Sequence, residues 1–111
     1  MLTYVRWYSA DDDRWNYEEL DADGWALRHV EVRVSDGVVV AAASLAEVLI
    51  ARDSGIVGAV GAYEQRYGVV PEAPFPLPAA TLDPALENVS PGKFEHLWRN
   101  ARRQLERQTG T

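Results

Sequence analysis

Hydrophobic and polar residues alternate along much of the first half of the chain, which is the pattern of β-strands with one buried face. The alternation is strictest over residues 28–34. Asp-Gly pairs at 23–24 and 36–37 favour tight turns, because glycine accepts the positive φ that such turns need. The pattern therefore predicts four strands joined by short turns, at residues 2–9, 15–20, 25–34 and 38–43.

The spacing of apolar residues becomes helical after the fourth strand. Ser44 and Glu47 have the spacing of a capping box at a helix start, and Gly55 is placed to end that helix. Near the C-terminus, Ser90 predicts a second N-cap with Pro91 in the first helical position. This last helix carries apolar residues at helical spacing: Phe94, Leu97, Trp98, Ala101 and Leu105.

The pattern between the two helices is less regular. The pattern of residues 56–68 is compatible with either a helix or a loop, because Gly58 and Gly61 each weaken a helix by about 1 kcal/mol. Residues 69–80, the proline-rich segment, hold four of the six prolines and predict an ordered, extended path. Residues 81–89 are compatible with one helical turn. No repeat or linker divides the chain, so we expect a single domain over residues 1–111.

These elements predict an α+β fold, with a four-stranded antiparallel meander sheet and two or three helices packed on one face. The opposite face is expected to be open. The residues expected at the helix-covered interface are Val30, Val32 and Val34 from the sheet, and Phe94, Leu97 and Trp98 from the last helix.

A two-residue turn at Asp23-Gly24 would set the register of the second and third strands. It predicts three cross-strand pairs: Leu20–Leu27, Glu18–His29 and Asn16–Glu31. Because side chains alternate, His29 would lie between Glu18 and Glu31 on the open face. Glu19 would point to the other face and meet Arg28.

This predicted cluster has two interpretations. A carboxylate beside histidine raises the pKa of the imidazole, so the group could act as a general acid or base or bind a cation. Such pairs are also routine on solvated sheet faces, where they contribute little. If the chain is an enzyme, the catalytic candidates are Glu18, His29 and Glu31. The candidate binding residues are Trp15, Tyr17, Glu18, Trp25, His29, Glu31 and Arg33.

The net charge of −6 arises in residues 1–50, which hold four arginines and ten carboxylates. This acidity makes nucleic acid an unfavourable partner, because phosphate contacts need basic groups. It suits a basic protein partner, or it serves only to keep the surface solvated. The end of the last helix is basic. Its cations either interact favourably with the helix C-terminus or pair with acidic residues elsewhere. They are Arg99, Arg102, Arg103 and Arg107.

Several classes of chemistry lack the residues they need. The absence of cysteine excludes disulfides, thiolate metal sites and thiol nucleophiles. Dinucleotide, Walker, nucleophile-elbow and zincin motifs are all missing. The acidic residues 11–13 and 21–23 do not match a calcium loop, so we expect no cofactor and no metal site beyond a weak Mg²⁺ or Ca²⁺ contact at the Asp triplet. Without a long apolar run or a secretion-signal layout, we expect a cytoplasmic protein with no membrane partner.

The segments VRWY, YEELDADGWALRHVEVRVSDG and SPGKFEHLWRNA together resemble domain of unknown function 6881, a family of small bacterial proteins. The residues that carry the resemblance are Trp7, Glu19, Asp21, Arg28, Val30, Glu31, Asp36, Gly37, Phe94, Glu95 and Trp98. Ala26 stands where the family pattern has an acidic residue, and residues 44–70 diverge. The resemblance implies no established activity, although size and acidity are similar to those of accessory or immunity proteins of bacterial toxin systems.

Two functions are expected from these observations. The favoured one is a non-enzymatic, protein-binding accessory or immunity-type module that docks a basic partner on an acidic, aromatic-containing hairpin face. The alternative is a small cofactor-independent enzyme or small-molecule-binding protein with a Glu/His pocket on the open sheet face. A homodimer joined through the sheet or through the arginine-rich helix is a third alternative.

Overall fold

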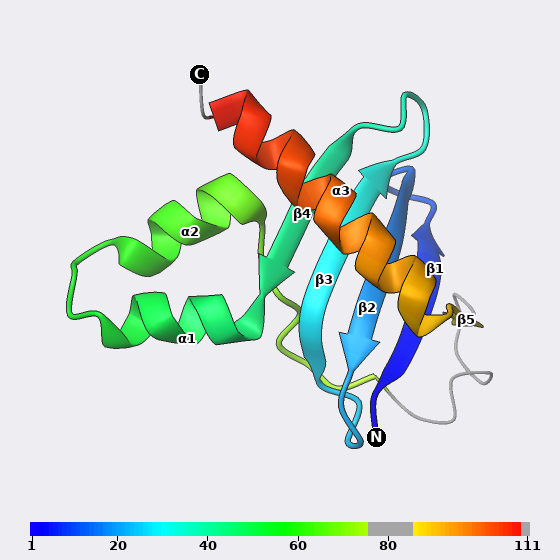
Figure 1. Cartoon of the computed structure of the whole chain (residues 1–111), viewed down its shortest axis with the longest axis horizontal. Helices are drawn as coiled ribbons and strands as arrows, with labels where there is room; N and C mark the ends of the chain where they lie inside the picture. The colour runs from blue at the N-terminus through cyan, green and yellow to red at the C-terminus, as the bar shows by residue number, and fades with distance from the viewer. Residues whose placement is uncertain (76–85, 110–111) are drawn as a thin grey trace.

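The computed structural model describes residues 1–75 and 86–109 of the chain. This part forms an antiparallel sheet of five strands, in the order β4-β3-β2-β1-β5, with three α-helices (Figure 1). The elements are β1 (Thr3–Ser9), β2 (Arg14–Leu20), β3 (Ala26–Arg33), β4 (Val39–Ser44), α1 (Leu45–Asp53), α2 (Ala59–Tyr67), β5 (Glu87–Asn88) and α3 (Pro91–Thr109). The predicted α+β class and the antiparallel meander of the first four strands are confirmed.

The short strand β5 was not predicted. It pairs with β1 opposite Val5 and Arg6, and Arg6 also forms an ion pair with Glu87 (3.1 Å). Two residues are too few to show an alternating pattern, so the sequence carries no signal for this strand. The greater part of the expected helical turn, residues 81–85, lies outside the described residues.

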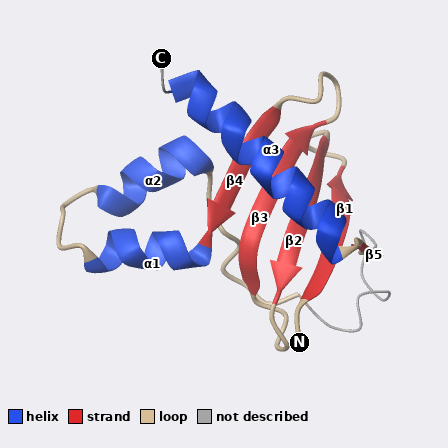
Figure 2. Cartoon of the chain, in the orientation of Figure 1, coloured by secondary structure: helices blue, strands red, loops and turns tan. Residues whose placement is uncertain are grey.

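Helix α3 crosses one face of the sheet diagonally (Figure 2). It begins at Pro91 as predicted, and the Ser90 hydroxyl accepts the backbone N–H of Lys93 (3.2 Å), which confirms the N-cap. Phe94 is fully buried, and its ring centre lies 5.2 Å from that of Tyr4 on β1. The first turns of α3 are therefore anchored on the edge of the sheet that β1 forms with β5.

Two of the three valines predicted beneath this helix belong to the core. Val30 is fully buried, and Val32 packs against the same core. Val34 is 44% exposed, so that prediction is wrong. Strand β3 ends at Arg33, and the backbone N–H of Val34 donates to the Asp13 carbonyl (3.0 Å). Val34 thus leaves the strand, and its side chain no longer follows the alternation.

The second face of the sheet is covered, which corrects the prediction of an open face. The described part of the proline-rich segment, residues 69–75, lies against it. The Phe75 N–H donates to the Gly24 carbonyl (2.8 Å), and the Phe75 ring lies 6.4 Å from that of Trp7. Val5, which points to this face, is fully buried. Since prolines lack an N–H, such a segment can cover a sheet without pairing with it.

Helices α1 and α2 form a hairpin beside the β4 edge, so α3 is the one helix of the described residues that lies across the sheet face (Figure 1). Helix α1 follows Ser44 as predicted, but the Ser44 side chain makes no capping bond, so the predicted capping box is wrong. Glu47 instead accepts the Tyr63 hydroxyl (2.6 Å) and forms an ion pair with Arg102 of α3. A charged guanidinium is a stronger partner for this carboxylate than a backbone N–H. The ambiguous residues 56–68 contain α2.

The loop between β2 and β3 is longer than the predicted two-residue turn. The Asp21 carbonyl accepts the N–H of Gly24 (3.0 Å), and the Asp21 N–H donates to the Trp25 carbonyl (2.9 Å). Gly24 has a φ of 85°, in the left-handed region that glycine adopts without strain. These bonds close a three-residue loop, the second common hairpin length.

A β-bulge compensates for the extra loop residue. It places Leu20 opposite Ala26, so the predicted pairing of Leu20 with Leu27 is wrong. The register beyond the bulge is the predicted one. It confirms two pairs, Glu18–His29 and Asn16–Glu31.

Two hairpin glycines can separate backbone strain from contact with the proline-rich segment. Gly37→Ala should lower the free energy of unfolding by about 1–2 kcal/mol, because φ is 71° and no described atom lies within 4 Å of the added Cβ. Gly24→Ala should lower it by about 3 kcal/mol or more, because its Cβ would lie 2.1 Å from the Phe75 carbonyl oxygen. Urea unfolding of both variants measures the difference, and equal losses would contradict the packing described.

Candidate functional site

The predicted Glu18, His29 and Glu31 come together on the face that the proline-rich segment covers. His29 Nδ1 lies 2.7 Å from Glu18 Oε1, and His29 Nε2 lies 2.8 Å from Glu31 Oε1. The β2–β3 register produces the first contact, and the two-residue spacing along β3 produces the second. Trp7 Nε1 donates to Glu18 (2.9 Å), and Arg14 donates to Glu31 (2.8 Å). We call these five residues the histidine cluster.

The centre of the histidine cluster is buried, although the sequence predicted an exposed group. The His29 side chain is 3% exposed and that of Glu18 is fully buried. Burial alone would lower the pKa of His29, but hydrogen bonds to Glu18 and Glu31 outweigh it and raise the pKa to about 9. The imidazole is therefore a cation at neutral pH, and both of its ring nitrogens donate.

The contacts of this cluster favour a structural role. A buried charge is tolerated when it is paired and hydrogen-bonded, and His29 meets a carboxylate at each ring nitrogen. Both Glu18 oxygens are also engaged, one by His29 and one by the Trp7 indole. No ring nitrogen is left to accept a proton from a substrate. The cluster therefore joins β1, β2 and β3.

A second group of charges lies on the opposite face, beneath α3. Arg28 donates to Glu19 through Nε and Nη2 (2.8 Å each), which confirms the predicted pair. It also forms an ion pair with Glu95 of α3, and its guanidinium lies 5.0 Å and 5.2 Å from the rings of Phe94 and Trp98. Hydrogen bonds from Arg28 hold the pKa of Glu19 below its ordinary value despite burial. Arg28 thus ties α3 to the sheet.

The other predicted binding residues do not join the histidine cluster. Trp15 and Tyr17 alternate with Glu18 along β2 and point to the α3 face. Arg33 pairs with Asp36 in the exposed β3–β4 turn (2.9 Å). The expectation of one binding surface is therefore corrected, because the predicted residues occupy both faces of the sheet, the end of β3 and the β2–β3 loop.

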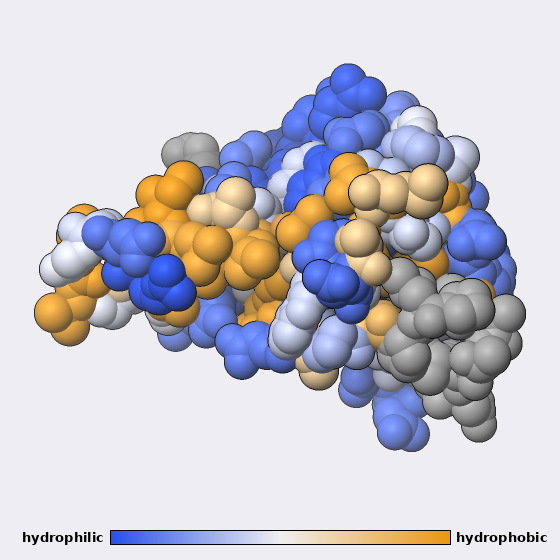
Figure 3. Space-filling view, turned by 90° about the horizontal axis from the view of Figure 1, so that it is seen from below, coloured by the Kyte–Doolittle hydropathy of each residue, from blue (hydrophilic) through white to orange (hydrophobic). Residues whose placement is uncertain are grey.

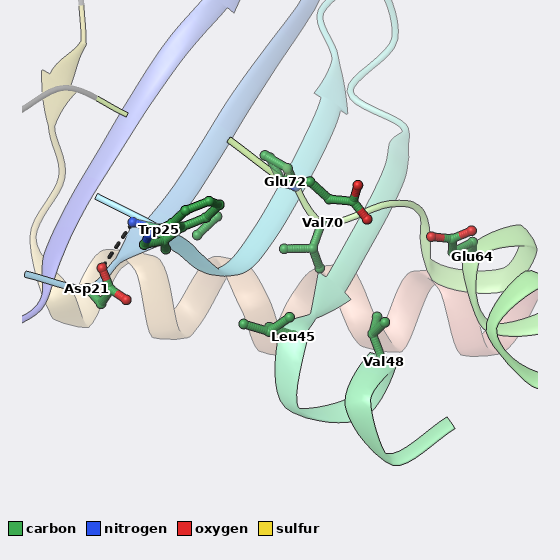
Figure 4. A pocket seen from close by; sticks show the side chains of 9 residues that line it. Asp21, Trp25, Leu45, Val48, Glu64, Val70 and Glu72 are labelled. Atoms are coloured by element: carbon green, nitrogen blue, oxygen red, sulfur yellow. Dashed lines mark hydrogen bonds between the residues drawn. The ribbon is translucent and has the colours of Figure 1, made fainter. Parts of the chain in front are cut away.

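Trp25, the remaining predicted residue, borders a separate cleft between the β2–β3 loop, α1, α2 and the proline-rich segment (Figure 4). The cleft has a volume of about 290 Å³. Its wall is mostly aliphatic and aromatic, and Trp25 is 42% exposed, so its ring is accessible. The residues that line the cleft are Asp21, Trp25, Ala26, Leu45, Val48, Glu64, Val70, Pro71 and Glu72.

The described residues that line this cleft include three carboxylates and no cation, and we call it the acidic cleft. Asp21 Oδ1 accepts the backbone N–H groups of Asp23 (2.9 Å) and Trp25 (3.0 Å), which fixes the loop that carries the indole. The side chains of Glu64 and Glu72 have no hydrogen-bond or ion-pair partner among the described residues. Both charges are available to a ligand.

The α1–α2 hairpin exposes apolar residues. Figure 3 shows hydrophobic residues gathered over the α1–α2 hairpin and toward the middle of the molecule. Helix α1 has no buried residue, and at the hairpin Ile50, Ile56 and Val57 are 71%, 70% and 101% exposed. Groups of exposed apolar residues are typical of interaction surfaces.

Sequence reasoning missed Glu64 and Glu72. They lie in α2 and in the proline-rich segment, far along the chain from Trp25, and no periodic pattern relates the three. The available signal was the Val70-Pro71-Glu72 sequence, in which an apolar pair precedes a charge in a segment predicted to be ordered. That signal indicates that Glu72 lies at the surface, but it does not indicate which residues lie beside it.

Comparison with known proteins finds no family model, no curated protein and no solved structure that matches the chain. The resemblance to domain of unknown function 6881 therefore stays a prediction. Within residues 1–75 and 86–109, no group of three or more His, Asp or Glu side chains could hold a metal ion. No helix in the same ranges combines the length and apolarity that crossing a membrane requires.

The buried imidazolium predicts a titration that NMR can follow. The His29 ring should titrate with a midpoint near 9, above the ordinary value of 6.5. His96→Gln leaves a single histidine and so assigns the signal. Because the folded pKa exceeds the unfolded one, His29 contributes its full stabilisation below pH 6.5 and loses it as the pH rises through 9, about 3 kcal/mol in all.

The stability difference between the wild type and His29→Gln should therefore shrink as the pH rises from 6.5 to above 9. Chemical denaturation at several pH values measures it, and a variant that does not fold leaves the NMR midpoint as the test. A midpoint at or below 6.5 would show that the histidine cluster does not hold a buried cation.

Proposed function

We propose that the chain is a non-enzymatic binding module that docks a basic segment of a partner protein in the acidic cleft. The observation that carries this proposal is an apolar cleft lined by three carboxylates and no cation. Aliphatic walls accommodate the methylene stems of lysine and arginine, while carboxylates pair with their head groups. The exposed ring of Trp25 adds a surface for a cation–π contact.

The charge of the whole chain supports the same class of partner. The net charge is −6, and residues 1–50, which include Asp21 and Trp25, hold most of the carboxylates. Such a field raises the rate at which a basic protein encounters the cleft and disfavours acidic competitors. An accessory or immunity-type role, in which the chain occupies a basic site of its partner, is part of this proposal.

The histidine cluster supports an enzymatic function less well. General acid–base catalysis works best when the pKa of the group lies near the operating pH, whereas the pKa of His29 is raised to about 9. The side chain is also 3% exposed and hydrogen-bonded at both nitrogens. The acidic cleft is open and its glutamates have no partner among the described residues, so it is the better candidate for binding.

Three synthetic decapeptides with alternating residues can test this function: a Lys-Leu, a Glu-Leu and a Lys-Ser peptide. The Lys-Leu peptide should shift the amide resonances of Trp25, Val48 and Val70 in ¹H–¹⁵N spectra, because it supplies both cations and apolar side chains. The Glu-Leu peptide should not bind, and the Lys-Ser peptide should bind more weakly. The double variant Glu64→Gln/Glu72→Gln should reduce Lys-Leu affinity roughly tenfold.

The matched control is Asp11→Asn/Asp12→Asn, which removes two charges from the exposed β1–β2 loop. Its affinity for the Lys-Leu peptide should change less than about twofold, since remote exposed charges are screened. Equal weakening by the two double variants would indicate nonspecific attraction. Resonance shifts confined to another surface would place the binding site elsewhere, and either result would contradict the proposal.

A further inference from the structure

The acidic cleft has two charged ends. Figure 4 shows Asp21 beside Trp25 at one end and Glu64 at the other, with the Glu72 carboxylate on the side toward Glu64. The aliphatic side chains of Leu45, Val48 and Val70 lie between them. An occupant of this cleft therefore meets negative charge, then an apolar surface, then negative charge again.

The Asp21 end is held in a fixed geometry. Oδ1 of Asp21 accepts two backbone N–H groups of its own loop, while Oδ2 has no hydrogen-bond partner among the described residues. The same bonds orient Trp25, whose ring is partly exposed. A cation placed here would contact both a carboxylate oxygen and an aromatic face, which is a favourable combination for arginine or lysine.

The opposite end draws its charge from two elements. Glu64 comes from α2 and Glu72 from the proline-rich segment, and neither side chain has a partner within the described residues. No cation stands among the described lining residues, so a basic side chain bound at this end would meet two negative charges. This end therefore has its own preference for a basic side chain, independent of Asp21.

The middle of the cleft excludes charge. Val70 is 6% exposed and forms part of the hydrophobic core, and Leu45 and Val48 pack against that core. A cation held over these side chains would lose water without gaining a hydrogen bond, which is unfavourable. An apolar side chain at the same place would be removed from water at no such cost.

We propose that the docking segment of the partner carries two basic residues separated by at least one apolar residue. One basic residue lies against Asp21 and Trp25, the apolar residue lies on Leu45, Val48 and Val70, and the other basic residue lies between Glu64 and Glu72. This inference rests on the proposed function and adds the order of residues that the cleft selects. A uniformly basic segment fits less well, because its middle cation would face the aliphatic surface.

A phage-displayed library of random dodecapeptides can test this order. The library is selected in parallel on the wild type, on Asp21→Asn and on Glu64→Gln/Glu72→Gln. Asparagine keeps the oxygen that accepts the two loop N–H groups, so Asp21→Asn removes the charge and retains the loop. Peptides enriched on the wild type should contain two basic residues flanking one or more apolar residues, and each variant should lose the requirement for one of the two.

Calorimetry on the consensus peptide then assigns each basic residue to one end. Replacing either basic residue with glutamine should weaken binding to the wild type about fivefold. Replacing the basic residue that lies against Asp21 should not change the affinity for Asp21→Asn. Replacing the one that lies between Glu64 and Glu72 should not change the affinity for Glu64→Gln/Glu72→Gln. Such a cycle isolates each pair from the general effect of charge.

The possible outcomes separate the inference from the function on which it rests. Enriched peptides with one basic residue, or with an uninterrupted basic run, would overturn the inference while leaving a cation-binding cleft. A selection on the wild type that enriches no basic peptides would overturn both.

Discussion

The register between β2 and β3 is the constraint on which the rest of the structure depends. It pairs Glu18 with His29 on the face covered by the proline-rich segment, and Glu19 with Arg28 on the face covered by α3. A slip of one residue would move the side chains of one strand to the opposite face of the sheet. It would separate the two members of each pair. Because His29 and Arg28 are mostly removed from water, a separated pair would leave a buried charge, which is strongly unfavourable. The register is therefore specified by electrostatics as well as by the hydrophobic core, and it fixes the start of the loop that carries Trp25.

Much of the sheet could be predicted from the sequence, because its signals are local. The alternating pattern predicted the first four strands, and Ser90 predicted the start of α3. The extra residue in the β2–β3 loop could not be predicted, since the bulge that absorbs it leaves no mark on the alternating pattern. The same is true of the second covered face. Its cover includes Phe75 of the proline-rich segment, which is distant in sequence and has no periodic pattern.

The candidate site was predicted only in part for the same physical reason. Cross-strand neighbours follow from register, so the contact of His29 with Glu18 was predictable, whereas its burial depended on a segment whose path was unknown. Trp25 was named as a binding residue, but the glutamates that share its cleft come from elements joined to it only through tertiary packing. Propensity and periodicity describe each element separately, while a cleft is a property of how elements meet.

The proposed function requires the acidic cleft to bind a basic, partly apolar segment. Intermolecular nuclear Overhauser effects between isotope-labelled protein and the unlabelled Lys-Leu decapeptide test it most directly. We expect contacts from lysine methylene protons to the Trp25 indole and from leucine methyl groups to Val70 and Val48. Contacts restricted to α3, or to the exposed Ile56 and Val57 of the α1–α2 hairpin, would contradict it.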